Sequence, residues 1–290
     1  MNATRRTLGI LHPGEMGGPV GAAARRAGSR VLWASEGRSA ASRQRAEQAG
    51  LEDAGSLSWL VAEAQTLISV CPPHAAQSLA EAVAALGFTG LYIDANAVSP
   101  AHTAEIATTL HRAGAGFVDG GIVGPPVRRA GTTRLYLSGD RAAEAAGCFE
   151  GSPLAAVVMT GDIGAASALK MAYAAYTKGG TALLATILAL AQGHGVEADL
   201  RREWDLSHPG LADEARKSIE RAAPKAWRFV GEMGEIAATF EELGLPGGFH
   251  HAAADIYRRF EGHAEDPASE ASSLIQELLE RGAPATRAQV

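Results

Sequence analysis

The stretch GILHPGEMGGPVG, from Gly9 to Gly21, stands near the start of this 290-residue chain and decides how the first half should fold. It begins inside the apolar run Leu8–Leu11, which is typical of a buried strand. The run Met16–Ala27 is typical of a helix, with Gly28 just past its end. Because a second strand is predicted at Val31–Ala34, the glycine-rich stretch becomes the turn between strand and helix in a βαβ unit.

The spacing of this turn nearly matches the dinucleotide fingerprint G-x-G-x-x-G, whose glycine positions fall on His12, Gly14 and Gly17. Gly14 would let the backbone approach a pyrophosphate, and Gly17 would let the helix pack closely on the strand. The helix N-terminus would offer N–H groups to the phosphates. His12 can replace the first glycine if its φ stays negative, and Pro13 then fixes the following φ. We expect cofactor contacts from His12, Pro13, Gly14, Glu15 and Met16, with an ordinary glycine turn as the alternative.

The segment WASEGRS at the end of the second strand bears on which nicotinamide cofactor is bound. An NAD site usually has an acidic residue here, whereas an NADP site has small or hydroxyl residues and an arginine for the 2′-phosphate. Ser35 lies near the strand tip, Arg38 follows it, and Arg43 and Arg45 lie on the next predicted helix. Glu36 is an acidic residue in the same segment and favours NAD. We therefore expect NADP(H), bound with the help of Ser35 and Arg38, and NAD remains possible.

Apolar runs and helix-like stretches alternate through the first half of the chain, and the pattern then changes. Further strands are predicted at Leu67–Cys71, Leu91–Ala95, Phe117–Asp119, Leu135–Leu137 and Ala155–Met159. This alternation predicts an α/β fold, a Rossmann domain with a doubly wound parallel sheet over residues 1–162. The rest shows helical stretches alone, at 165–192, 209–222, 225–243, 249–261 and 269–281. We therefore expect an all-α domain over residues 163–290, serving the substrate and dimerisation.

The composition limits the kinds of partner that the chain can have. Apolar residues make up 47 %, charged residues 20 %, and the net charge is −6, which is the balance of a soluble globular protein. This charge argues against a nucleic-acid or anionic membrane partner. Two cysteines, no signal peptide and no apolar stretch long enough to span a bilayer predict a cytoplasmic protein that acts on a small molecule. We expect no metal site, because His250 and His251 lack further ligands at suitable spacing.

A second group of candidate residues lies on the apolar helix predicted after Gly164. Ser167, Lys170, Tyr173 and Thr177 are spaced to fall on roughly one face of that helix. A lysine among apolar residues is costly to bury unless it is used or paired, and burial lowers the pKa of a lysine toward neutrality. Lys170 is therefore a candidate acid–base residue, and a lysine that merely extends its head to water is the alternative.

These motifs, in this order, resemble the β-hydroxyacid dehydrogenase superfamily, which includes 3-hydroxyisobutyrate and 6-phosphogluconate dehydrogenases and the imine reductases. The most similar branch is that of 6-phosphogluconate-dehydrogenase-like proteins with a C-terminal domain of unknown function. The segment HPGEMG keeps Gly14, Met16 and Gly17 of the family's G-L-G-x-M-G. The segments ISVCPP, DANAVSP and FVDGGIVGPP are similar to three further family motifs. Lys170 falls where the family has its catalytic lysine.

The resemblance implies hydride transfer between the nicotinamide and a carbonyl or alcohol substrate, with a lysine as acid–base. Lys170 would exchange the proton, and Tyr173 or Ser167 would assist it. The resemblance places Cys71, Pro72 and Asn96 at the cofactor, and Ile122, Val123, Gly124, Tyr173 and Thr177 at the substrate. It also implies a homodimer, which suits the segment Thr181–Ala191 because that segment shows no polar face.

The chain departs from the family pattern at positions that bear on the substrate. Val123 replaces the serine of the substrate loop, and Tyr173 and Ala174 replace two asparagines. Gly231, beside Glu232, stands where the family has a second lysine. These changes argue against a small 3-hydroxy acid as substrate, so we expect a substrate that is hydroxy-acid-like or larger. Imine reduction is the alternative within the fold, against which Lys170 counts. A dinucleotide-binding protein without catalysis is the alternative from another class.

Overall fold

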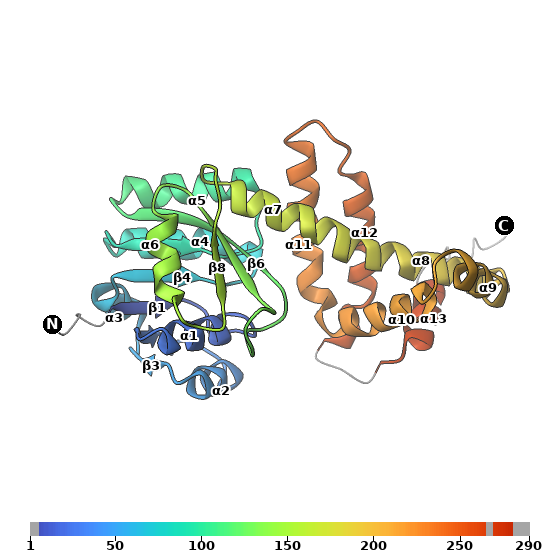
Figure 1. Cartoon of the computed structure of the whole chain (residues 1–290), viewed down its shortest axis with the longest axis horizontal. Coiled ribbons are helices and arrows are strands. Elements are labelled where there is room, and N and C mark those ends of the chain that lie inside the picture. The colour runs from blue at the N-terminus through green and yellow to red at the C-terminus, as the bar shows by residue number, and fades with distance from the viewer. Residues whose placement is uncertain (1–5, 265–268, 281–290) are drawn as a thin grey trace, which may run out of the picture. The chain divides into compact units, whose positions relative to one another are not determined.

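The computed structural model describes residues 6–264 and 269–280, which form two compact units that meet between Met171 and Ala172 (Figure 1). The sequence predicts a boundary after residue 162, where the strands end. The units instead divide inside helix α7 (Ala165–Ala174). The physical reason is that the first turns of α7 pack on the sheet: the backbone N–H of Ser167 donates to Asp119, which lies in a strand.

The first unit is built on an eight-stranded sheet with the order β3-β2-β1-β4-β5-β6-β7-β8. The strands are β1 (Thr7–Ile10), β2 (Arg30–Trp33), β3 (Glu52–Asp53), β4 (Thr66–Ser69), β5 (Leu91–Asp94), β6 (Gly116–Val123), β7 (Arg134–Ser138) and β8 (Ala155–Val158). The sheet is mostly parallel, as the sequence predicts; β6 and β7 form the one antiparallel pair among its described strands. The connection over residues 124–133 contains no helix, so it forms a hairpin rather than a crossover.

Helices cover both faces of this sheet, so the unit is doubly wound as the sequence predicts. They are α1 (Gly17–Arg26), α2 (Ala40–Ala49), α3 (Leu57–Glu63), α4 (Pro73–Ala85), α5 (Pro100–Arg112) and α6 (Ala142–Ala146), with the short 3₁₀ helix η1 (Gly147–Phe149). One apolar core lies under α1, α2 and α6, and another under α3, α4 and α5. The strand order reverses between β1 and β4, where ligands bind in folds of this kind.

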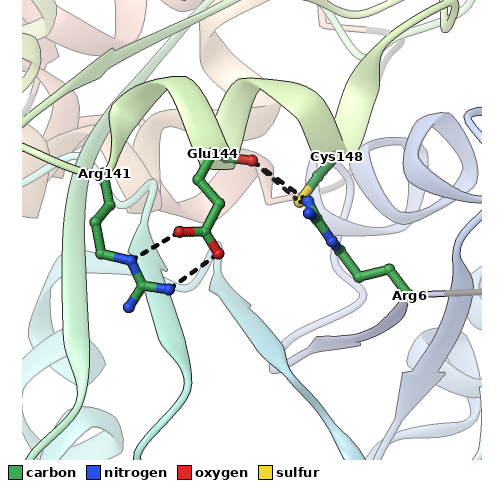
Figure 2. Close-up of polar contacts among 4 residues, drawn as sticks. All are labelled: Arg6, Arg141, Glu144 and Cys148. Atoms are coloured by element: carbon green, nitrogen blue, oxygen red, sulfur yellow. Dashed lines mark hydrogen bonds and ion pairs between the residues drawn. The ribbon is translucent and has the colours of Figure 1, made fainter. Parts of the chain in front are cut away.

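The start of β1 is tied to α6 by a group of polar side chains (Figure 2). Arg6 donates to the sulfur of Cys148 over 3.2 Å and to the carbonyl oxygen of Glu144 over 3.4 Å. Arg141 donates to both carboxylate oxygens of Glu144, at 2.8 and 2.9 Å. These hydrogen bonds and the positive charge of Arg141 lower the pKa of Glu144. The group therefore fastens the segment that enters β1 to the helical turns after β7.

The second unit is helical. A π-helical segment, η2 (Ala175–Gly179), is followed by α8 (Gly180–Gly193), α9 (Glu197–Ser207), α10 (Leu211–Ala222), η3 (Ala223–Lys225), α11 (Ala226–Glu241), α12 (Gly248–Arg259), η4 (Glu261–His263) and α13 (Ala271–Glu280). Helix α9 is absent from the sequence prediction, because no residue in it is buried and its pattern is mostly charged. Strand β3 is missed for a similar reason, since both of its residues are exposed and acidic.

The run Ala165–Gly193 passes a length and hydropathy test for a membrane span, a test that core helices of soluble proteins also pass. It is 29 residues long, and 44 % of its most apolar window is buried in the chain. Several large apolar side chains on its second-unit part are exposed, among them Tyr176 (81 %) and Leu190 (62 %). Among the described residues, this part of the helix therefore presents apolar side chains at the surface.

Candidate cofactor and catalytic site

The loop between β1 and α1 has the close packing that the fingerprint requires. The backbone N–H of Gly14 donates to the carbonyl oxygen of His12 over 2.9 Å, which closes a tight turn. A Cβ on Gly17 would lie 2.1 Å from that same oxygen, so only glycine fits there. A Cβ on Gly14 would meet the His12 ring at 3.7 Å, an ordinary contact. Gly17 therefore serves the fold, whereas Gly14 keeps the outer side of the loop open.

The first turn of α1 is suited to an anionic ligand. Met16, at its N-cap position, makes no side-chain capping hydrogen bond, and the turn contains no acidic residue. The leading N–H groups of a helix lack partners within the helix and carry partial positive charge. A phosphate group at the loop would take up these donors.

Three arginines from the segment after β2 donate to backbone carbonyls, two of them in this loop and one at the tip of β2. Arg38 donates to Leu11 over 2.9 Å, Arg43 donates to Ser35 over 2.9 Å, and Arg45 donates to Pro13 over 3.3 Å. These guanidinium groups gather positive charge at the tip of β2. Glu36 is exposed, and its backbone N–H donates to the carbonyl oxygen of Gly55 over 2.9 Å.

The acidic residue nearest to Ser35 is Asp53, at the end of β3. Partial burial would raise the pKa of Asp53, but the net shift is downward. It is lowered by hydrogen bonds from the Ser35 hydroxyl and from backbone N–H groups of Gly55 and Ser35, and by the charge of Arg43. The Ser35 side chain, which the sequence predicts to contact the cofactor, is 7 % exposed and already serves this carboxylate.

Asn96 connects the ends of β4 and β5. Its side-chain nitrogen donates to Asp94 and to Ser69, each over 2.9 Å, and its side-chain oxygen accepts from the backbone N–H of Cys71 over 2.6 Å. Asn96 is 3 % exposed. These bonds of the Asn96 amide are all internal to the protein, and its cofactor contact stays a prediction. The turn through Cys71 and Pro72 is the part of this network that borders the switch point.

Two buried groups in this network have strongly shifted pKa values. Burial raises the pKa of Asp94 to about 7; hydrogen bonds from Asn96 oppose the shift, and the charge of Asp119 adds to it. Burial also raises the pKa of the Cys71 thiol to about 11. Cys71 is therefore a neutral thiol near pH 7 and is not an activated nucleophile.

Lys170 lies directly over β6. A Cβ on Gly121 would stand 3.1 Å from the Cβ of Lys170 and 2.6 Å from the carbonyl oxygen of Ala166, so a glycine in β6 lets α7 approach. Lys170 is half-buried. Strand β6 continues four residues past Asp119, the residue that pairs with the end of β5. The stem of Lys170 is thus placed at the carboxyl end of the sheet, on the side where ligands bind in this fold.

Ser167 has a different role from the predicted catalytic one. It is 2 % exposed, and its hydroxyl donates to Asp119 over 2.6 Å and bonds Thr103 over 2.8 Å. The last two residues of the predicted face, Tyr173 and Thr177, belong to the second unit. Tyr173 is 47 % exposed, and the Thr177 hydroxyl donates to the carbonyl oxygen of Tyr173 over 3.2 Å within the helix.

The expected substrate loop begins later than the sequence predicts. Ile122 and Val123 belong to β6 and are 6 % and 4 % exposed, because the strand extends to pair with β7. Gly124 is exposed and has a φ of +115°. A Cβ on Gly124 would lie 2.3 Å from the carbonyl oxygen of Thr132, so the loop needs glycine at its first residue.

In the second unit, Glu232 forms an ion pair with Lys178, a residue of the π-helical segment. The Lys178 ammonium also lies 4.6 Å from the centre of the Phe229 ring, and the Tyr257 hydroxyl donates to the Lys178 carbonyl oxygen over 2.7 Å. Glu232 is 7 % exposed. The Glu232 carboxylate, next to Gly231, is therefore neutralised by an ion pair with a lysine of the same unit.

Two domain families match the chain, in the order that the two units suggest. Residues 7–147 match the NAD binding domain of 6-phosphogluconate dehydrogenase, and residues 191–260 match a domain of unknown function, DUF1932. These matches and the solved structures make the chain similar to proteins of the β-hydroxyacid dehydrogenase superfamily. It therefore carries the NAD(P)-binding dehydrogenase and reductase fold of this superfamily.

Solved structures share this fold. A conserved hypothetical protein from Sinorhizobium meliloti 1021 is 25 % identical, with a TM-score of 0.66 over 96 % of this chain and 97 % of that one. The 3-hydroxyisobutyrate dehydrogenase of Mycobacterium tuberculosis is 20 % identical, with a TM-score of 0.68 over 95 % and 99 %. A reductive aminase from Aspergillus terreus, solved with NADPH, is 19 % identical, with a TM-score of 0.57 over 95 % and 100 %. No curated protein sequence matches significantly.

Sequence reasoning overlooked two buried carboxyl groups, Asp94 and Asp119. Both stand in otherwise apolar strand sequences, YIDAN and FVDGG. An acidic residue inside a strand that is covered on both faces is costly to bury, so each needs dedicated hydrogen-bond donors. An acidic residue in a strand predicted to be buried was therefore the feature of the sequence that could have pointed to both positions.

Proposed function

We propose that this protein is an NADP(H)-dependent oxidoreductase that transfers hydride between the nicotinamide and a carbonyl or alcohol substrate, with Lys170 as the acid–base residue. The observation that carries the proposal is the position of Lys170, whose stem lies over Gly121 at the carboxyl end of the sheet. NADP(H) would supply or accept the hydride. Lys170 would donate a proton to the carbonyl oxygen during reduction, or accept it from the alcohol during oxidation.

The preference for NADP(H) is supported by the arginines around the tip of β2. Arg38 and Arg43 are held against backbone carbonyls on either side of this tip. A phosphate on the ribose 2′ position would meet two guanidinium groups that the backbone already orients, which lowers the entropy cost of binding. The loop at Gly14 and the N-terminus of α1 would take the pyrophosphate.

The test is a panel of aldehydes, ketones, hydroxy acids and cyclic imines, assayed by the absorbance of NADPH. We expect turnover with at least one carbonyl or alcohol, and Lys170→Met should lower kcat about 10²–10⁴-fold while the affinity for NADPH stays unchanged. Lys217→Met is the matched control, because Lys217 is an exposed lysine on α10 and should tolerate the change. Turnover of imines alone, unaffected by Lys170→Met, would favour imine reduction instead. NADPH binding without turnover of any compound would favour a binding protein.

We also propose a homodimer in which a second copy covers the exposed apolar side chains of η2 and α8. Tyr176, Leu183 and Leu190 are exposed on this one helical run, and exposed apolar patches mark interfaces. The wild-type protein should sediment as a dimer at micromolar concentration, and Leu190→Glu should sediment as a monomer. Leu206→Glu, on the exposed face of α9, is the control that should remain a dimer.

Both cysteines are free thiols, which supports a reducing cytoplasmic location.

A further inference from the structure

Asp119 stands inside β6 and is fully buried, yet it carries a carboxyl group. Its Oδ2 accepts hydrogen bonds from the backbone N–H groups of Gly164 and Ser167, at 2.9 and 3.0 Å, and from the Ser138 hydroxyl at 3.0 Å. Its Oδ1 accepts from the Ser167 hydroxyl at 2.6 Å. Three of these four bonds come from the turn that begins α7, so the carboxyl group caps that helix from a strand.

This cap differs from the ordinary caps of the same domain. Ser39, Ser56 and Ser99 each cap the helix that starts at the next residue, so they fix only where their own helix begins. Asp119 precedes Ser167 by 48 residues and belongs to another element. Its hydrogen bonds therefore fix where α7 sits on the sheet. The partial positive charge of a helix N-terminus favours a carboxyl group at this place.

Further contacts hold the same turn against β6. The Ser138 hydroxyl, which donates to Asp119, accepts from the backbone N–H of Ala166 over 3.1 Å. The hydroxyl of Thr103, from α5, bonds the Ser167 hydroxyl over 2.8 Å. The close approach at Gly121 brings the first turn of the helix onto the strand.

Lys170 follows Ser167 by three residues, so it lies one turn further along the same side of α7. The first turn is fixed by Asp119, and the Cβ of Lys170 lies over Gly121, two residues after Asp119 in the same strand. Any shift of the first turn along β6 would carry the Lys170 stem with it. The placement of the lysine at the carboxyl end of the sheet thus depends on a side chain that itself lies below the site.

We propose that Asp119 is a positioning residue: by clasping the start of α7 onto β6, it holds Lys170 at the carboxyl end of the sheet. This inference rests on the proposed function of Lys170. Asp119 is fully buried and acts through the helix rather than through the substrate. Misplacement of a reacting group by about 1 Å can cost about 10²-fold in rate, so loss of the clasp should lower kcat rather than cofactor affinity.

The first experiment needs no substrate, because the chain has only four lysines: Lys170, Lys178, Lys217 and Lys225. Trace acetylation with acetic anhydride, followed by peptide mass spectrometry, gives the reactivity of each lysine against pH. In Asp119→Ala the pH profile of Lys170 should shift, while those of Lys217 and Lys225 should stay as in the wild type. Ser56→Ala, which removes the ordinary cap of α3, is the control that should leave all four profiles unchanged.

The second experiment uses a substrate from the panel. Asp119→Ala should lower kcat about 10²-fold, with the dissociation constant for NADPH unchanged. Asp119→Asn keeps the shape, can still accept at one atom, and should recover part of the lost kcat. Ser167→Ala removes one of the four bonds and should give a smaller loss in the same direction. If Asp119→Ala does not fold, these two variants and their Lys170 profiles carry the test.

The outcomes separate this inference from the proposed function. Wild-type kcat and wild-type Lys170 profiles in folded Asp119 and Ser167 variants would overturn the positioning role, even if Lys170→Met is inactive. A loss of stability alone, equal to that of Ser56→Ala and without a change in kcat, would also overturn it. Normal turnover in Lys170→Met would instead remove the proposed function itself.

Discussion

The backbone N–H of Cys71 donates to the side-chain oxygen of Asn96 over 2.6 Å, which ties the turn after β4 to the residue that follows β5 by two positions. Asn96 is held in turn by Asp94, which accepts from its backbone N–H at 3.0 Å and from its side-chain nitrogen at 2.9 Å. This chain of bonds shapes the turn Cys71–Pro72 at the switch point of the sheet. It is made entirely of protein groups, so its effects can be measured without a substrate.

Asn96→Ala should destabilise the protein, because it leaves the Cys71 N–H without its acceptor and the Asp94 Oδ2 without its side-chain donor. Buried polar groups that lose a partner cost about 1–3 kcal/mol each, and urea unfolding should show a loss of that order. Thr108→Ala, which removes an exposed hydroxyl bonded within α5, is the matched control. An Asn96→Ala protein as stable as this control would show that the network is dispensable.

Asp94 predicts a distinct dependence of stability on pH. Burial raises its pKa from 3.8 to about 7, so between these values the folded state holds a proton that the unfolded state has lost. Stability from this group is therefore full below pH 3.8 and is lost as pH rises through 7, by up to about 1.4 kcal/mol per pH unit.

The measurement compares the free energy of unfolding of the wild type and Asp94→Asn from pH 4 to pH 9. Asparagine cannot accept both bonds from Asn96, so the variant carries a cost that does not depend on pH. The wild type should lose stability relative to Asp94→Asn as pH rises to about 7, with no further relative change above it. Parallel curves over the whole range would contradict the raised pKa of Asp94.

Two glycines of the loop between β1 and α1 should differ in how their replacement by alanine changes stability. Gly17→Ala places a Cβ 2.1 Å from the His12 carbonyl oxygen, so the loop must shift, and overpacking of this kind costs about 1–3 kcal/mol. Gly14→Ala meets only the His12 ring at 3.7 Å and should leave stability unchanged. If the pyrophosphate passes over Gly14, the added methyl group should instead lower the affinity for NADPH, which calorimetry measures. Equal unfolding free energies for both variants would contradict the assigned role of Gly17.

Arg38→Ala and Arg43→Ala should each reduce the preference for NADPH over NADH. A charge-assisted hydrogen bond to the 2′-phosphate contributes about 1.5–3 kcal/mol. The loss of either arginine should therefore lower the affinity for NADPH by about 10-fold or more. NADH should bind with unchanged affinity, since it lacks that phosphate. Arg112→Ala, at the end of α5, is the control of equal charge. If the wild type binds NADH as tightly as NADPH, the site does not distinguish the two cofactors by the 2′-phosphate.

The sequence by itself determined the class of fold and the place of the glycine-rich turn between β1 and α1, because both depend on local patterns. Buried strands give short apolar runs, and Gly17 is required by a contact only five residues away, at His12. Three features escaped prediction: the antiparallel pairing of β7, the extension of β6 through Val123 and the exposed helix α9. The partner of a strand in the sheet leaves no apolar periodicity in the sequence, and neither does a helix whose surface is charged.

Only the tertiary structure decided what the polar side chains do. In sequence, Ser167, Lys170 and Tyr173 form one stripe, yet Ser167 is buried on Asp119 while Tyr173 is half exposed. Asn96 likewise becomes a link between two strands. A hydrogen bond between residues 25 or 48 positions apart depends on strand order and helix docking, which arise when the whole core packs and which no local pattern encodes.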